Sequence, residues 1–199
     1  MSAVAFVDPA LEQTPAPVAR AAETPSIEIS AATARDLEAL KRYRGYATES
    51  QLVGTTLVLA RQITEVAAKA GDTFSFVTPR GMLDSSVSVH GLFSDAIAGR
   101  RGANNAISAI GDFRSNVARE KPAVKLNASN VKDLEKIRDY LVEQRLASRD
   151  MPVGDVFRCS VSVLRAVEDQ VSGRGLEFTS TRPQETSPAV TARGHAYRL

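Results

Sequence analysis

The sequence predicts an α+β fold in which two copies of one strand–helix–helix unit pair within a single chain. An internal repeat aligns residues 27–43 with residues 124–140 without a gap. In each copy the apolar residues change from alternating to helical spacing. With 43% hydrophobic residues among 199, the chain is also large and apolar enough to build one folded domain.

The repeat carries identical residues at equivalent positions of its two copies. The first copy contains Ala31, Asp36, Leu37, Glu38 and Tyr43, which recur as Ala128, Asp133, Leu134, Glu135 and Tyr140. After a short insertion in the second copy the match resumes, so that Gly54 meets Gly154. Residues 71–76 also resemble residues 173–178. This continuation over further segments favours a duplication over chance.

Each copy begins with a short predicted strand, over residues 26–30 and 123–127. Alternation places four aliphatic side chains on one face, namely Ile27, Ile29, Val124 and Leu126. The other face carries Ser26, Glu28, Ser30, Ala123, Lys125 and Asn127. A two-stranded ribbon is marginal alone, so we expect the aliphatic face to pack on helices.

Two helices are predicted after each strand. The first helix has apolar residues at helical spacing in both copies. They are Ala34, Leu37 and Leu40 in the first copy and Val131, Leu134, Ile137 and Leu141 in the second. The second, over about 51–70 and 151–171, is apolar on more than one face and should lie in the centre of the core. In the first copy Gly45 can end the first helix, and Thr48 or Ser50 can cap the second. In the second copy Ser148 or Asp150 can cap the second helix, and Pro152 suits its first turn.

The chain divides into a folded domain and two tails. The Pro-rich residues 1–25 predict a disordered N-terminal tail, and residues 182–199 predict a flexible C-terminal tail. The single domain, 26–181, is expected to contain repeat 1 (26–79), a helical insertion (80–121) and repeat 2 (122–181). Extra strands are predicted at about 73–77 and 176–179, and one or two helices within 92–119.

Composition and motifs exclude several classes of protein. One Cys and two His leave no basis for a disulfide framework or a Cys/His zinc site, and Cys159 is expected to be a small buried residue. No phosphate-binding Gly-Lys-Ser/Thr loop and no nucleophile elbow occur. We therefore predict no catalytic residues, no metal and no cofactor. Without a long apolar run or a basic leader, a cytoplasmic location and no membrane partner are expected.

Strand, helix, turn and helix in this order resemble the ribbon-helix-helix DNA-binding superfamily. The resemblance covers roughly residues 26–71 and 123–172, and the two copies in one chain are like the tandem TraY-type and Ti-plasmid virulence accessory proteins of conjugative DNA transfer. It implies tandem ribbon-helix-helix repeats that form an intramolecular pseudo-dimer, with extra strands and a helical insertion between the copies. It also implies a ribbon that enters the major groove of double-stranded DNA.

The polar ribbon face is the candidate for reading bases. Lys125 can donate to guanine, Asn127 can pair with adenine, and Glu28 can accept from cytosine N4, while Ser26 and Ser30 complete the face. Any exposed ribbon carries polar residues, however, so a purely structural role is the alternative. Because the two half-ribbons differ, the expected DNA site is asymmetric.

Phosphate contacts are expected at the starts of the second helices. Backbone N–H groups and the helix dipole bind phosphate there, assisted by Thr48, Ser50, Ser148 and Arg149, although plain helix capping is an equal alternative. Arg100 and Arg101, with Asn104 and Asn105, form a Gly-flanked basic turn that is either a second phosphate contact or a solvated loop.

These features favour a non-enzymatic DNA-binding protein. Its expected roles are those of an accessory factor in plasmid or mobile-element transfer or partition, or of a transcriptional repressor, with other proteins of a transfer or partition complex as further partners. The alternative is a protein-interaction module with the same fold that does not bind DNA. Glu28, Ala123 and a net charge of only +2 favour that alternative.

Overall fold

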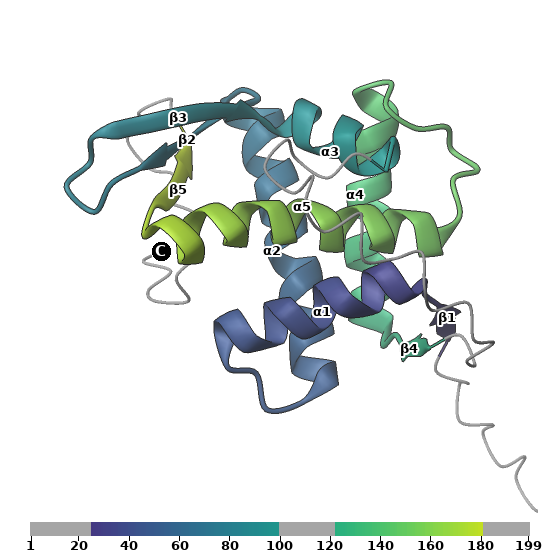
Figure 1. Cartoon of the computed structure of the whole chain (residues 1–199). Helices are drawn as coiled ribbons and strands as arrows, with labels where there is room; N and C mark the ends of the chain where they lie inside the picture. Colours follow the sequence, from purple (N-terminus) through teal and green to yellow (C-terminus); the bar gives the residue numbers. More distant parts are fainter. Residues whose placement is uncertain (1–24, 100–121, 181–199) are drawn as a thin grey trace, which may run out of the picture.

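The structure, a computed structural model, describes residues 25–99 and 122–180 (Figure 1). The predicted tails lie outside these residues, except for Pro25 of the first. Most of the predicted insertion lies outside them as well, including the basic turn with Arg100 and Arg101 and the residues Asn104 and Asn105.

The described chain is a mixed α+β structure, as predicted. The first copy contains β1 (Ser26–Glu28), α1 (Ala31–Arg44), α2 (Glu49–Ala70) and β2 (Thr73–Val77). Then follow β3 (Leu83–Ser88) and α3 (Val89–Ile97). The second copy contains β4 (Ala123–Lys125), α4 (Ala128–Glu143), α5 (Val153–Arg174) and β5 (Glu177–Ser180).

The first strands end earlier than predicted, because the residue that was expected to close each strand begins a helix instead. Ser30 is the N-cap of α1, and its side chain accepts a hydrogen bond from Thr33 N at 3.1 Å. Asn127 caps α4 in the same way, accepting from Asn130 N at 2.8 Å, and Asn130 Oδ1 accepts in return from Asn127 N. These bonds satisfy backbone donors that a helix start leaves unpaired. The ordered strands are therefore 26–28 and 123–125.

The second helices start differently in the two copies. Gly45 ends α1 with a φ of 66°, and Thr48 caps α2 by accepting from Gln51 N at 3.2 Å, as the sequence predicts. The prediction for α5 is wrong, because Pro152 occupies the N-cap position and neither Ser148 nor Asp150 caps this helix. The residues Ser148–Met151 form a turn instead, closed by Met151 N donating to Ser148 O at 3.1 Å.

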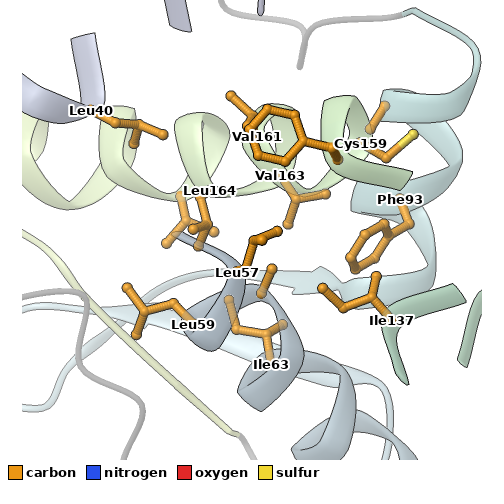
Figure 2. Close-up of a cluster of buried hydrophobic side chains, with 14 of the residues drawn as sticks. Leu40, Leu57, Leu59, Ile63, Phe93, Ile137, Cys159, Val161, Val163 and Leu164 are labelled. Atoms are coloured by element: carbon orange, nitrogen blue, oxygen red, sulfur yellow. The ribbon is translucent and has the colours of Figure 1, made fainter. Parts of the chain in front are cut away.

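The helices of the two copies are intertwined. Helix α1 packs mainly against α5, α4 packs mainly against α2, and α2 crosses α5 in the centre (Figure 1). Figure 2 shows Leu57 and Ile63 of α2 facing Val163 and Leu164 of α5. Leu57, Ile63 and Val163 are at most 1% exposed, and Leu164 is 4% exposed. Each copy therefore completes its core with helices of the other copy.

The two sheets join equivalent residues of the repeat. Strands β1 and β4 pair antiparallel with Ile27 opposite Val124, two residues that the repeat aligns. The second sheet has the order β3-β2-β5, and in it Phe76 lies opposite Phe178, which the repeat also aligns. The strand expected over about 73–77 matches β2, the strand expected over about 176–179 begins one residue before β5, and the sequence does not predict β3.

Candidate nucleic-acid interface

The β1–β4 ribbon has one buried and one exposed face, as the alternation predicts. On the inner face Ile29, Val124 and Leu126 are 7%, 2% and 1% exposed, and Ile27 is half-buried. The outer face presents Ser26, Glu28, Ala123 and Lys125, all of them exposed. The ribbon therefore exposes a narrow polar face and packs on the helices with its apolar face.

Backbone hydrogen bonds extend the ribbon symmetrically past the ends of its strands. Ile29 N donates to Pro122 O at 2.9 Å, and Leu126 N donates to Pro25 O at 2.8 Å. Both donors and both acceptors are equivalent positions of the repeat. The geometry of the ribbon is thus nearly two-fold symmetric, although its side chains are not.

Two of the predicted base-reading residues lie beside the ribbon rather than on it. The side chains of Ser30 and Asn127 are already engaged in capping α1 and α4. Both residues remain exposed. The outer face of the paired strands therefore retains Ser26, Glu28 and Lys125 from the predicted set.

Equivalent glycines of the two second helices lie close to other elements, one of them to the ribbon. A Cβ placed on Gly154, in the first turn of α5, would lie 4.0 Å from the backbone oxygen of Glu28. A Cβ placed on the equivalent Gly54 of α2 would lie 3.7 Å from Asn130 Nδ2 in the first turn of α4. The start of α5 thus lies beside the ribbon at Glu28, and the second turn of α2 lies beside the start of α4.

Of the predicted phosphate-binding residues, the four that the structure describes have exposed side chains in different surroundings. Thr48 is occupied as the cap of α2, and Ser50 lies in the first turn of that helix after the acidic Glu49. Ser148 and Arg149 precede α5 in the turn that closes at Met151. A hydrogen bond from Ser148 lowers the pKa of the Asp150 carboxyl, which keeps a negative charge beside Arg149. The basic character of both flanks is therefore modest.

Two polar contacts between the copies are not predicted by the sequence. Arg44 of α1 forms an ion pair with Glu168 of α5, which is only 2% exposed and also accepts from Ser172 Oγ at 3.1 Å. Arg61 of α2 lies 2.8 Å from Asp133 of α4. Asp133 recurs in the repeat as Asp36, but the equivalent of Arg61 is Val161, so the repeat does not reveal the pair.

In the parts of the chain that the structure describes, we find no metal site, and the one cysteine is not a reactive nucleophile. Cys159 is buried in α5, and its burial raises the pKa of the thiol to about 11, so the unreactive protonated form prevails at neutral pH. Residues 25–99 and 122–180 contain no cluster of three or more His, Cys, Asp or Glu side chains that could hold a metal. Over the same ranges, no helix has both the length and the apolar character needed to span a membrane.

Comparison of this chain with protein-family models, with curated proteins and with solved structures finds no match.

Proposed function

We propose that this chain is a non-enzymatic DNA-binding protein of the ribbon-helix-helix type. Its two repeats act as an intramolecular pseudo-dimer, and the β1–β4 ribbon enters the major groove of double-stranded DNA. The observation that carries this proposal is the register of the ribbon, in which Ile27 lies opposite Val124. A two-fold axis through an antiparallel ribbon places one residue opposite its own equivalent, and the repeat makes Ile27 and Val124 equivalent.

The helix packing gives the proposal independent support. In a two-fold pair of strand–helix–helix units, each unit must bury its apolar second helix against the other unit. Here α1 packs on α5, and α4 packs on α2, while α2 and α5 form the centre. This exchange of helices is what the pairing of two such units requires, and it leaves the ribbon on the outside of the helical core (Figure 1).

The dimensions of the ribbon suit the major groove. Paired strands lie about 4.8 Å apart, and a groove about 12 Å wide admits a two-stranded ribbon with its side chains. The exposed Ser26, Glu28 and Lys125 can reach base edges, while the exposed residues at the starts of α2 and α5 can contact phosphates.

The tandem arrangement favours particular roles. It resembles that of accessory proteins in conjugative transfer, so we infer a role in plasmid or mobile-element DNA transfer or partition, or in transcriptional repression. In such a role the protein would bind in the cytoplasm, alongside other proteins of a transfer or partition complex. A single chain with two unlike half-ribbons suits an asymmetric site, because a palindrome needs identical halves.

A fluorescence-anisotropy titration against plasmid fragments at two salt concentrations tests the proposal. Phosphate contacts release counterions, so the affinity should fall steeply with rising salt, and a short specific duplex should compete better than random DNA. Lys69→Ala serves as the control variant, because Lys69 lies in the last turn of α2, far along the helix from the ribbon. The absence of binding to any fragment at low salt would contradict the proposal.

The second candidate is a protein-interaction module that uses the same fold without DNA. The exposed Glu28 favours it, because a carboxylate on the ribbon repels phosphates. A mixed-charge ribbon can instead dock on another protein. Under this alternative the wild-type protein does not bind DNA in the titration described above, and the Glu28→Ala variant does not bind DNA either. Appearance of DNA binding in Glu28→Ala alone would indicate a ribbon that has lost an ancestral DNA-binding activity.

A further inference from the structure

The outer face of the ribbon carries opposite charges at its two ends. Lys125 lies directly opposite Ser26, and Glu28 lies directly opposite Ala123. The inward-facing pair Ile27–Val124 lies between them, so the cation and the carboxylate fall on opposite sides of the centre of the ribbon. We call these two pairs the lysine end and the glutamate end.

The spacing of the two ends matches a short step along DNA. Residues two positions apart in a strand are separated by about 6.6 Å. Base pairs are stacked about 3.4 Å apart, so the two ends can face base pairs separated by about one intervening pair. The lysine and glutamate ends therefore address two different base pairs within one turn of the groove.

Each end favours one base by the donors and acceptors that it presents. An ammonium group has only donors, and guanine presents two acceptors and no donor in the major groove, whereas adenine adds a repelling N6 donor. A carboxylate has only acceptors, and cytosine presents a donor alone, whereas adenine adds the N7 acceptor beside its N6. Guanine offers two acceptors against the single O4 of thymine, so Lys125 favours guanine, and Glu28 favours cytosine, which presents a donor and no acceptor.

We propose that the ribbon reads two guanines on the same DNA strand, one on each side of the pseudo-two-fold axis. This inference rests on the DNA-binding function proposed above. Glu28 and Lys125 are equivalent positions of the repeat, so they face symmetry-related bases on opposite strands. If one of these bases is guanine and the other is cytosine, their pairing places both guanines on one strand. A palindromic site would place one guanine on each strand instead.

Selection of tight-binding duplexes from a randomised pool tests this arrangement. The wild-type protein should enrich sites with both guanines on one strand. Reversing either G·C pair in the enriched site should weaken binding about 5- to 140-fold. Enrichment of palindromic sites, or equal binding to duplexes with a reversed pair, would overturn the inference while leaving DNA binding itself intact.

Two variants assign each base to its residue. Gln pairs with adenine N6 and N7, so Glu28→Gln should change the preference at the glutamate end from cytosine to adenine, and Lys125→Gln should change guanine to adenine at the lysine end. Glu38→Gln, on the exposed side of α1, and Lys69→Gln are matched controls and should keep the wild-type preference. If Glu28→Gln and Lys125→Gln melt as the wild type does and keep its base preference, the assignment is refuted. Absence of binding to every duplex at low salt would overturn the proposed function, and the inference with it.

Discussion

The hydroxyl of Tyr140 donates a hydrogen bond to Asp72 Oδ1 at a distance of 3.2 Å. Tyr140 lies near the end of α4, and Asp72 follows α2, so this bond joins the first helix of one copy to the second helix of the other. Its repeat equivalent, Tyr43 of α1, donates to Asp169 Oδ1 of α5 at 3.0 Å. Both tyrosines thus connect the two copies, although their acceptors, Asp72 and Asp169, are not equivalent positions of the repeat.

The two tyrosines should differ in their contribution to stability. Tyr140 is 5% exposed and Tyr43 is 41% exposed. Because a hydrogen bond to a charged group contributes about 1.5–3 kcal/mol when it is shielded from water, we expect Tyr140→Phe to lower the free energy of unfolding by about that amount. Tyr43→Phe should cost less than about 1 kcal/mol. Urea denaturation of both variants measures the difference, and equal losses would contradict this assignment.

The same residue predicts how stability depends on pH. Burial, followed by the negative charge of Asp72, raises the pKa of Tyr140 above its usual value near 10. A raised pKa in the folded state stabilises the fold below pH 10, and this contribution is lost as the pH rises above the pKa of the unfolded chain. The wild-type protein should therefore lose stability above about pH 10, and Tyr140→Phe should lose less. Denaturation curves at pH 8 to 11 compare the two proteins.

Lys125, at the end of β4, and the following Leu126 should respond differently to substitution by alanine. Leu126 is 1% exposed beneath the ribbon, so Leu126→Ala should lower the stability by about 2–5 kcal/mol through lost packing and a cavity. Lys125 is exposed on the outer face, so Lys125→Ala should melt as the wild type does. If the ribbon reads DNA, Lys125→Ala should also lose about 1–3 kcal/mol of discrimination at one base pair. Thermal melting together with DNA titration checks both variants, and early melting of Lys125→Ala would show that the faces are assigned backwards.

The buried ion pair between α1 and α5 should depend on both partners. Removing Arg44 leaves Glu168 as an uncompensated buried charge, so Arg44→Met should cost about 3–5 kcal/mol. The double variant Arg44→Met/Glu168→Leu removes both charges and should be more stable than Arg44→Met alone. Chemical denaturation of the single and double variants measures this coupling. A double variant that is less stable than Arg44→Met would indicate that Glu168 has a further role.

The thiol of Cys159 should report on global unfolding. It is the only cysteine of the chain, it is buried in α5, and its pKa is raised to about 11. A thiol-specific reagent at pH 8 should therefore react slowly with the native protein and quickly in urea. Fast labelling under native conditions, at a rate independent of added urea, would show that α5 is not packed as described.

The sequence predicts the pairing of β1 with β4 because an unpaired strand with Ile27 and Ile29 on one face needs a partner, and the repeat supplies one. It does not predict where the strands end. Ser30 and Asn127 suit both a strand and a helix cap, and the unpaired N–H groups at the helix starts decide in favour of capping.

Other features could not be predicted because no local pattern marks them. Strand β3 is rich in serine and mostly exposed, so it lacks the alternation of a half-buried strand. The pair Arg44–Glu168 joins distant parts of the chain, and the equivalent of Arg44 in the second copy is the apolar Leu141. The candidate base-reading face could be predicted in part, since Ser26, Glu28 and Lys125 lie where the alternation places them.

The exchange of helices between the copies has a consequence during protein synthesis. Helix α2 is complete once Ala70 has been made, but α5, which covers it in the centre of the core, ends only at Arg174. At about 5–20 residues per second, the ribosome needs roughly 5–20 s to synthesise the chain between these two residues. Collapse of a nascent chain takes at most about 100 μs, so the first repeat waits with its apolar surface exposed. The ribbon can form only when the second half of the chain has emerged, and every completed molecule then carries both halves at a fixed ratio of one to one.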